Sequence, residues 1–471
     1  MSVILVAPPS VGWAKAVNRE GRKCYLDAFL KDVGGVQNAR YFPIEALGLA
    51  SIQAFGRRRG LRIKVVNAIA SYHCSVEETW DALVRVAARA GAPVLVGFTG
   101  ANVVLEENLW LAGRCRDRWP GVRVILGSDF ATMNAERLLN ECPEVDFVCL
   151  GDGELLVAEL AERLNRGGGG FAELAGLAYR DERGVPCVNA ASPLELDALP
   201  WAEREEVHVA ALHGFGAAVS ASRGCPYQCT FCSTAGASRK KGHGGGWRLR
   251  SPEAVLDEVE SLHKDHGVRH VVFTDELFLI DSEASRERAR AFAEGFLKRH
   301  LDVQFMFDCR ADAIEPDLFA HLARAGLRQV FVGLESGHAG QMARYRKAYR
   351  KGVDPASQLR LVSDLGIRVV PGIITFHAET TLEELRDTYR LVEGFPCDKL
   401  FVFLNRVNPF PGTRLWHEYR DKGYLKTEWP VAEFAFQDER IERIFTEIWR
   451  VASEPGASYA RLKEAFARLL G

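Results

Sequence analysis

Short apolar runs alternate with amphipathic segments along most of this chain, and this alternation limits the fold more than any other feature. Near-continuous Val, Ile and Leu runs are typical of parallel strands buried on both faces, and the amphipathic segments between them are typical of covering helices. The order strand–helix–strand predicts an α/β protein with a doubly wound parallel sheet. In the first part we expect strands at Val3–Val6, Ile63–Val66, Val94–Phe98, Val122–Leu126 and Val145–Leu150, with helices at Val76–Ala90 and Leu105–Trp119.

The alternation returns further along the chain, after a glycine-rich and hairpin-like linker. The two hairpin arms are predicted at Gly176–Arg180 and Val185–Val188. The last part is helical by pattern, with Leu462, Phe466 and Leu469 on one stripe. In the second part we expect strands at Ala217–Ser222, His270–Thr274, Val303–Cys309, Gln329–Gly333, Arg368–Ile374 and Lys399–Asn405.

These patterns predict four segments. Residues 1–165 form a first sheet domain, 166–215 a linker with a small hairpin, 216–415 a second domain, and 416–471 a small helical C-terminal segment. A chain of 471 residues is too long for one typical domain, which agrees with this division.

Composition excludes several classes of function. The net charge of −2 argues against nucleic-acid binding by bulk electrostatics. We find no signal-peptide pattern and no apolar run of membrane-spanning length, so we expect a cytoplasmic protein with no membrane partner. Eleven cysteines, an odd number, fit reduced thiols and a metal cluster better than a disulfide framework.

Three cysteines, Cys225, Cys229 and Cys232, follow the first strand of the second domain at CxxxCxxC spacing. Thiolates are soft ligands that hold iron–sulfur clusters, and three of them leave one iron of a four-iron cluster open to a ligand that is not protein. A structural zinc site or three unrelated buried thiols are the alternatives. Zinc sites usually add a second Cys or His pair, and only His243, in a glycine run, is near.

With Phe231 before the last cysteine, the motif resembles the signature of the radical S-adenosylmethionine (SAM) superfamily. The resemblance implies a 4Fe-4S cluster on Cys225, Cys229 and Cys232, whose open iron chelates the amino and carboxylate groups of SAM. Reduction by an electron donor such as flavodoxin or ferredoxin would then release a 5'-deoxyadenosyl radical. It also implies a partial (β/α)6 TIM-like barrel, with its site at the carboxyl ends of the strands.

Polar residues stand at several of these strand ends. Asp275 and Glu276 follow the second strand, where the resemblance places the amino group of SAM. Arg310 follows the third. Glu335 and Ser336 follow the fourth, in a Gly-Leu-Glu-Ser-Gly segment that resembles the Gly-Ile-Glu-Ser-Gly pattern of one branch. Each alone is a solvated helix cap as readily as a ligand, but their recurrence at successive strand ends favours a cofactor site.

The fifth strand end departs from the family pattern. Phe376 is a candidate for packing on adenine, and His377 for facing the substrate as an acid, a base or a hydrogen-bond partner. A buried histidine with a purely structural role is the alternative for His377.

Two glycine-containing loops follow strands of the first domain: Gly127-Ser128-Asp129 and Gly151-Asp152-Gly153-Glu154. Loops at the carboxyl ends of such strands bind ligands, and glycine lets a ligand approach the backbone. A first domain of this kind, followed by the cysteine motif, resembles the cobalamin-binding branch of the radical SAM superfamily. We therefore expect Gly127, Ser128, Gly151, Gly153 and Glu154 to contact cobalamin.

Two departures from the branch refine this expectation. The loop after Val6 lacks an Asp-x-His-x-x-Gly motif, and Ser128 stands in place of a glycine. We expect cobalamin without histidine on cobalt and with its dimethylbenzimidazole tail displaced. The tail should enter between the two glycine loops, and the upper face should point toward the barrel mouth.

The leading functional prediction is a cobalamin-dependent radical SAM methyltransferase acting on an unactivated carbon of a small natural-product-type substrate. A second hypothesis keeps the radical but transfers no methyl group, so that the reaction is dehydration, epimerisation, cyclisation or rearrangement. A third is a non-catalytic sensor of cobalamin or of the cluster, which the several polar strand ends disfavour.

Overall fold

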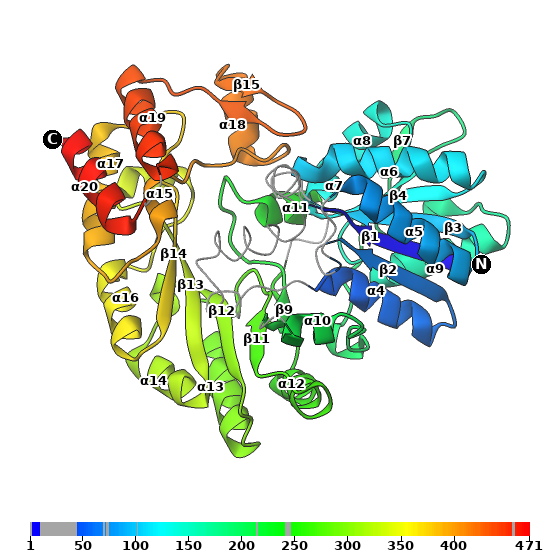
Figure 1. Ribbon diagram of the computed structural model, residues 1–471, viewed down its shortest axis with the longest axis horizontal. Coiled ribbons are helices and arrows are strands. Elements are labelled where there is room, and N and C mark those ends of the chain that lie inside the picture. Colours follow the sequence, from blue (N-terminus) through cyan, green and yellow to red (C-terminus); the bar gives the residue numbers. More distant parts are fainter. Residues whose placement is uncertain are drawn as a thin grey trace. The chain divides into compact units, whose positions relative to one another are not determined.

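The computed structural model of the chain describes residues 2–9, 45–68, 71, 75–100, 102–212, 215–240, 246–454 and 457–471 (Figure 1). It divides into two compact units. Unit 1 comprises Met1–Val219, Ser233–Arg250 and Ser261–Val272; unit 2 comprises Ser220–Cys232, Ser251–Glu260 and Phe273–Gly471. The chain therefore passes from unit 2 back to unit 1 between Cys232 and Ser233, directly after the third cysteine of the motif.

The first sheet has seven strands among the described residues, in the order β2-β1-β3-β4-β5-β6-β7. The first five are parallel, and the predicted hairpin adds the last two antiparallel at the edge. The order 2-1-3-4-5 is that of flavodoxin-like folds, so the predicted doubly wound, Rossmann-like parallel sheet is confirmed. The strands are β1 (Ser2–Ala7), β2 (Arg62–Asn67), β3 (Pro93–Thr99), β4 (Arg123–Gly127), β5 (Phe147–Cys149), β6 (Leu177–Arg180) and β7 (Pro186–Val188).

Helices cover this sheet on both faces. Val3 and Leu5 of β1 belong to one apolar core with Leu49 of α4 and Leu160 of α9, while α5 and α6 contact each other. Ser75 begins α5 by accepting a hydrogen bond from the Glu78 N–H. The helices of this part are α4 (Leu47–Arg58), α5 (Val76–Ala90), α6 (Leu105–Arg118), α7 (Asp129–Met133), α8 (Ala135–Glu141), α9 (Glu154–Asn165), α10 (Val207–Leu212) and α11 (Ser233–Lys240).

The second sheet has five strands within the described ranges, in the order β14-β13-β12-β11-β8. Neighbours β12, β13 and β14 pair in parallel, as predicted. The strands are β8 (Ala217–Val219), β11 (His270–Phe273), β12 (Gln304–Arg310), β13 (Leu327–Glu335) and β14 (Arg368–Ile373). The helices that follow or alternate with them are α12 (Pro252–His266), α13 (Glu283–Lys298), α14 (Pro316–Ala325), α15 (Ala339–Arg344), α16 (Pro355–Asp364) and α17 (Leu382–Glu393).

The two faces of β12 carry different chemistry. Phe305 and Phe307 are fully buried, and the ring of Phe305 lies 5.9 Å from that of Phe292 in α13. Because side chains alternate along a strand, Asp308 and Arg310 lie on the opposite, inner face of the sheet. The helices thus cover an aromatic outer layer, and the inner face holds the charged residues.

The prediction of a sixth strand at Lys399–Asn405 is wrong. Leu400–Phe403 form a short 3-10 helix, and only an isolated parallel bridge between Phe376 and Arg406 follows. The Thr375 hydroxyl donates a hydrogen bond to the Val402 carbonyl. This side-chain bond and the 3-10 turn stand where the backbone hydrogen bonds of a sixth strand were expected. A short apolar run is typical of a strand and of a buried turn alike, which is why the pattern misled.

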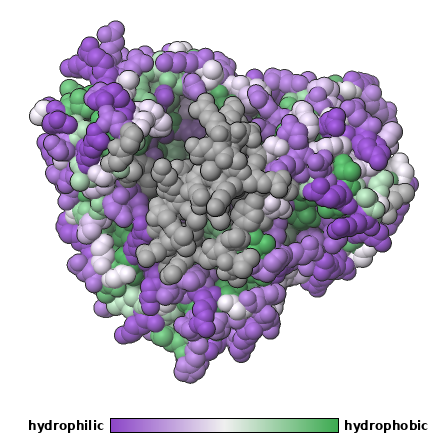
Figure 2. Space-filling view, in the orientation of Figure 1, coloured by the Kyte–Doolittle hydropathy of each residue, from purple (hydrophilic) through white to green (hydrophobic). Residues whose placement is uncertain are grey.

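The C-terminal segment is helical, as predicted, with one small antiparallel pair of strands. No helix among the described residues is long and apolar enough to cross a membrane. Hydrophilic residues cover most of the described surface in the view of Figure 2. The elements are α18 (Arg414–Asp421), β15 (Leu425–Thr427), β16 (Glu433–Phe434), α19 (Glu439–Ser453) and α20 (Tyr459–Leu470).

Candidate active site

The loop with the three cysteines begins at Gly224, whose φ of 84° favours glycine. Cys225, Cys229 and Cys232 are all partly buried. Burial raises the pKa of Cys225 to about 11, the Tyr227 N–H lowers it, and the nearby Cys232 and Cys229 raise it further. The three thiols are therefore close enough for their thiolates to repel one another.

This donor set fits an iron–sulfur cluster, because bound cations remove the repulsion between the three thiolates. Burial also raises the pKa of Cys229, which the Lys347 ammonium lowers. Within the described part of the chain, no three His, Cys, Asp or Glu side chains are placed to share one metal ion. In a four-iron cluster each thiolate binds a different iron, so such a shared position is not required.

Arg310 lies beside the cysteine loop. Its guanidinium carbon is 4.1 Å from the centre of the Tyr227 ring, a cation–π contact, and Nε and Nη2 donate to the Asp312 carboxylate at 2.9 and 2.8 Å. The side chain is 2% exposed, and no described residue accepts a hydrogen bond from Nη1. This orphaned donor fits a cofactor carboxylate, and cofactor binding by Arg310 stays a prediction.

Backbone carbonyls of α15 and the residue after it hold the other end of the loop. The Thr230 N–H donates to the Tyr345 carbonyl at 3.1 Å, and the Thr230 hydroxyl donates to the Arg344 carbonyl at 3.3 Å. The predicted Phe231 packs edge-on against the Tyr345 ring at 5.0 Å. These contacts fix the segment that carries Cys229 and Cys232.

The two acids after β11 take different positions. Asp275 is buried and accepts hydrogen bonds from the Ala221 N–H, at 3.0 Å, and from the Ser222 hydroxyl. Burial raises its pKa to about 6 against these bonds. Glu276 is exposed and accepts a hydrogen bond from the Gly224 N–H at 3.0 Å. Of the predicted pair, only Glu276 presents its carboxylate beside the cysteine loop.

Glu335, at the end of β13, has a φ of 62°, which is uncommon for a residue other than glycine. Its carboxylate, 8% exposed as a residue, pairs with the Lys347 ammonium at 2.5 Å. A Cβ on Gly333 would meet both Lys347 Nζ and Glu335 Oε1 at less than 3 Å, so this ion pair requires the glycine. Ser336 accepts a hydrogen bond from the His338 N–H and so holds the turn.

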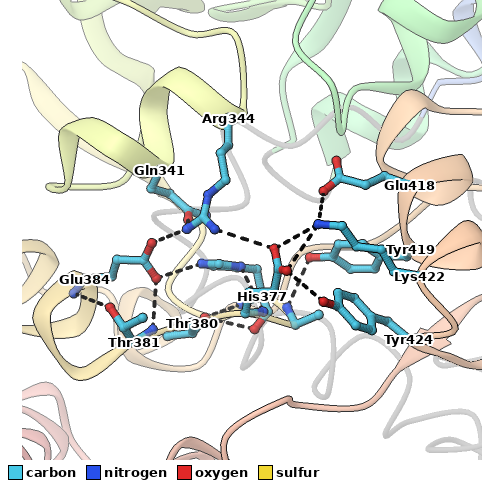
Figure 3. A network of polar contacts seen from close by, with 12 residues as sticks. Gln341, Arg344, His377, Thr380, Thr381, Glu384, Glu418, Tyr419, Lys422 and Tyr424 are labelled. Atoms are coloured by element: carbon cyan, nitrogen blue, oxygen red, sulfur yellow. Dashed lines mark hydrogen bonds and ion pairs between the residues drawn. The ribbon is translucent and has the colours of Figure 1, made fainter.

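Figure 3 shows the surroundings of His377, which is 5% exposed. The Glu379 N–H donates to Nδ1 at 3.2 Å, so Nδ1 carries no proton, and Nε2–H donates to Glu384 at 2.9 Å. The protein therefore uses both ring nitrogens. A role for His377 toward substrate stays a prediction, and it requires the ring to exchange one of these partners.

Glu384 joins this histidine to α15. Burial opposes its ionisation, but hydrogen bonds from His377 and the Thr381 N–H, with the Arg344 charge, hold the pKa of Glu384 below its usual range. The Arg344 guanidinium bonds to Glu384 and also lies 3.6 Å from Glu379. Because the Arg344 carbonyl accepts from Thr230, the network of Figure 3 reaches the cysteine loop.

Phe376 is fully buried in an aromatic cluster. Its ring lies 5.1 Å from that of Phe445 in α19 and 5.9 Å from that of Phe436. This is a core position, and contact with adenine stays a prediction.

In unit 1, the loop after β4 is held by protein contacts. Ser128 begins α7 by accepting from the Ala131 N–H at 3.0 Å. Asp129 accepts a hydrogen bond from the Thr234 hydroxyl of α11 at 3.1 Å. A Cβ on Gly127 would meet only Cys149, at 3.6 Å, which is ordinary contact. The described chain does not itself require glycine at position 127.

The loop after β5 is held in the same way. Gly151 has a φ of 88°, and a Cβ on Gly153 would lie 2.7 Å from Ile52. Asp152 forms a two-bond ion pair with Arg248, at 2.7 and 3.1 Å. Glu154, 2% exposed, accepts a hydrogen bond from the Ser51 hydroxyl at 2.6 Å. From Ser10 to Gly12, the loop after β1 lies outside the described residues, as does His243.

Sequence reasoning missed three residues that the structure places on the inner face or beside the loop: Lys347, Tyr227 and Asp308. Asp308 is partly exposed, and burial, followed by the charges of Asp275 and Glu276, raises its pKa to about 7. The period of two in Phe305-Met-Phe307-Asp308 was a signal for it, because two buried aromatics put Asp308 on the other face. No local pattern announces Lys347, which pairs from outside any strand.

The comparisons with known proteins agree with this geometry. A model of the Radical SAM superfamily matches residues 219–392, which include the cysteine loop and strands β11 to β14. The chain is a radical SAM enzyme. The family implies a 4Fe-4S cluster and SAM.

Three similar proteins extend the comparison beyond the radical SAM domain. An uncharacterized methyltransferase of Pyrococcus horikoshii is 25% identical over 79% of this chain and 77% of its own. The anaerobic magnesium-protoporphyrin IX monomethyl ester cyclase of Synechocystis is 26% identical over 64% of this chain, which spans 58% of that protein. The solved structure of the cobalamin-dependent SAM radical enzyme OxsB with aqua-cobalamin has a TM-score of 0.75 and 17% identity, covering 96% of this chain and 67% of that one.

Proposed function

We propose that this radical SAM enzyme is cobalamin-dependent and transfers a methyl group to an unactivated carbon of a small molecule. The observation that carries the proposal is the combination, in one chain, of a radical SAM domain and a first sheet of flavodoxin-like order, together resembling OxsB over 96% of the chain. The similar Pyrococcus protein bears a methyltransferase name, which supports the choice of reaction.

The residues present fit both the iron–sulfur cluster with SAM and cobalamin. Cys225, Cys229 and Cys232 would hold the cluster, and Arg310 offers its orphaned Nη1 donor to a carboxylate of SAM. For cobalamin, the observation that fits is that a Cβ on Gly127 would meet only Cys149, at 3.6 Å, so contacts within the described chain do not explain the glycine there. When bound, the cluster supplies the electron that cleaves SAM, and cobalamin supplies a carrier for the methyl group.

The chain's own residues position and shield this chemistry. Thr230 and Tyr227 anchor the cysteine loop, Arg310 and Glu335 are charged groups buried near it, and a protein electron donor such as flavodoxin or ferredoxin completes the proposal. Asp129 and Asp152 are engaged in unit 1, so recognition of a cobalamin tail there would rest on backbone and space.

Anaerobic reconstitution with iron, sulfide and hydroxocobalamin, followed by reduction in the presence of SAM and a candidate substrate, tests the proposal. Methyl transfer predicts both S-adenosylhomocysteine and 5'-deoxyadenosine, and a product heavier by one methyl group. Failure to retain cobalamin through gel filtration, or a product without the methyl group, would overturn it.

A second candidate keeps the radical and omits methyl transfer. Its support is the resemblance to the Synechocystis cyclase and the use of Ser128 and Asp129 for protein contacts in the loop after β4. This candidate predicts 5'-deoxyadenosine without S-adenosylhomocysteine in the same experiment.

A further inference from the structure

One layer of the inner face of the second sheet differs from the layers above and below it. Asp308 of β12 stands in register with Phe331 of β13, and Phe331 with Val370 of β14. Side chains in register on parallel strands share a face. All three residues are partly exposed, whereas Phe305 and Phe307 on the outer face are fully buried.

The layer below is closed. Met306 and Gln329 are in register and buried, and the Gln329 amide lies 3.7 Å from the Met306 sulfur. The layer above holds two glycines in register, Gly333 and Gly372, and the Lys347–Glu335 ion pair lies where a Cβ on Gly333 would be. A Cβ on Gly372 would lie 2.5 Å from the end of the Phe331 ring, so the ring reaches over the glycine. Asp308 and Phe331 thus lie between a closed layer below and a layer above that contains the buried Arg310.

Among the residues that the structure describes, Asp308 has no side-chain partner of its own. No described residue donates a hydrogen bond to its carboxylate or forms an ion pair with it, although it is enclosed enough for burial to raise its pKa to about 7. The nearby Asp275 and Glu276 also disfavour a negative charge on Asp308. Arg310, the next inner residue of β12, does not compensate for it, because its guanidinium pairs with Asp312. A buried carboxylate without a partner is costly, and a bound cation removes that cost.

We propose that Asp308 and Phe331 form the substrate-recognition layer of the barrel, with Asp308 accepting a protonated amine and Phe331 contacting the apolar body next to it. The proposal rests on the proposed function in that the bound molecule is the substrate. It names the chemical class as an amine-bearing molecule with an apolar or aromatic part. Val370 completes the apolar side of the layer.

Benzylamine is a probe that carries both features, and ligand-observed NMR on the full, anaerobically reconstituted chain measures its binding without turnover. We expect benzylamine to bind more tightly than benzyl alcohol and much more tightly than benzoate. Asp308→Asn should lower the affinity for benzylamine by about tenfold or more, as expected for a lost hydrogen bond to a charged group. Phe331→Leu should lower the same affinity by about threefold, because the contact with the aromatic ring is lost.

Asp364→Asn, an exposed acid at the end of α16, is the matched control and should leave benzylamine affinity unchanged. SAM affinity in Asp308→Asn should stay within about twofold of the parent, since the proposal gives this carboxylate to the substrate. Equal binding of benzoate and benzylamine, or an unchanged affinity in Asp308→Asn, would overturn it. Loss of SAM binding in that variant would also overturn it, because the carboxylate would then belong to the cofactor site.

The two proposals fail separately. Absence of a methylated product leaves the benzylamine result intact, and absence of benzylamine binding leaves the product analysis intact. If Asp308→Asn does not fold, Phe331→Leu alone decides: retention of full benzylamine affinity in that variant contradicts the proposal.

Discussion

The two sheets of this protein differ in whether the polar residues near their strand ends all have protein partners. In the first sheet, each polar side chain of the two glycine loops has a protein partner: Ser128 caps a helix, Asp129 binds Thr234, and Asp152 binds Arg248. In the second sheet, Asp308 has no hydrogen-bond or ion-pair partner among the described residues, and Arg310 keeps one donor free.

The difference teaches that a polar residue in a loop after a parallel strand is not by itself evidence of a ligand. In the first sheet the polar side chains of the two glycine loops already bind other parts of the protein, so a ligand there would meet mainly backbone atoms. In the second sheet Asp275 and Glu335 likewise have protein partners, whereas Asp308 and Nη1 of Arg310 have none among the described residues. Substitutions should therefore lower stability in the first sheet and change binding in the second.

The largest effect should come from the cysteine loop. Cys229→Ser removes one of the three proposed cluster ligands, and we expect loss of the iron–sulfur absorbance and of reductive SAM cleavage, because the cluster would then lack a full ligand set. Cys187→Ser, in the hairpin of the first sheet, is the control and should keep both. Iron content per chain after anaerobic reconstitution is the measurement, and a cluster of normal yield in Cys229→Ser would contradict the assigned ligands.

Asp152→Ala should lower the free energy of unfolding by about 2 kcal/mol, because it leaves a partly buried Arg248 without its carboxylate. Asp117→Ala, an exposed acid in α6, is the control. Chemical denaturation measures both variants. A change below about 0.5 kcal/mol in Asp152→Ala would show that this loop is not held by its side chains.

Asp308 should make stability depend on pH. Its pKa of about 7 in the folded chain lies above its usual value, so between about pH 4 and pH 7 the unfolded chain has lost a proton that the folded chain keeps. Stability therefore falls as pH rises through this window, by on the order of 2 kcal/mol once solvent screening is allowed for. Urea unfolding at pH 5 and pH 8 should show a smaller fall in Asp308→Asn, and an equal fall in both proteins would be inconsistent with an uncompensated carboxylate.

Ser128→Gly should have the smallest effect, a loss of a few tenths of a kcal/mol, because glycine is a tolerable first cap of α7. It should also keep or increase the hydroxocobalamin retained through gel filtration, since it removes bulk at the loop. Thermal unfolding and the absorbance of retained cobalamin are the measurements. A loss of cobalamin in this variant would mean that the Ser128 side chain itself takes part in binding.

The fold was largely predictable from the sequence. Buried runs such as Val3–Val6 have the composition of parallel strands, and the helix at Val76–Ala90 was predicted with the bounds that the structure shows. The sixth strand was not predictable, because the run at Leu400–Phe403 has no period that separates a strand from a turn.

For the candidate site, the sequence predicted which residues lie near the cysteine loop better than it predicted their contacts. The spacing of the cysteines predicts a shared ligand loop, and Arg310 was placed near it correctly. The sequence does not show that both nitrogens of His377 are hydrogen-bonded, although Glu379 and Glu384 follow closely in the chain. The turn after His377 and the start of α17 bring these partners to the ring, and the residue types alone do not specify that geometry.

The chain passes from one unit to the other directly after Cys232, so neighbouring residues there belong to different units. Ser233 begins a helix that belongs to unit 1 and is bound to it through Thr234 and Asp129, whereas the thiol of Cys232 belongs to unit 2. Cys232 and Ser233, which share one peptide bond, are thus held by contacts of different units.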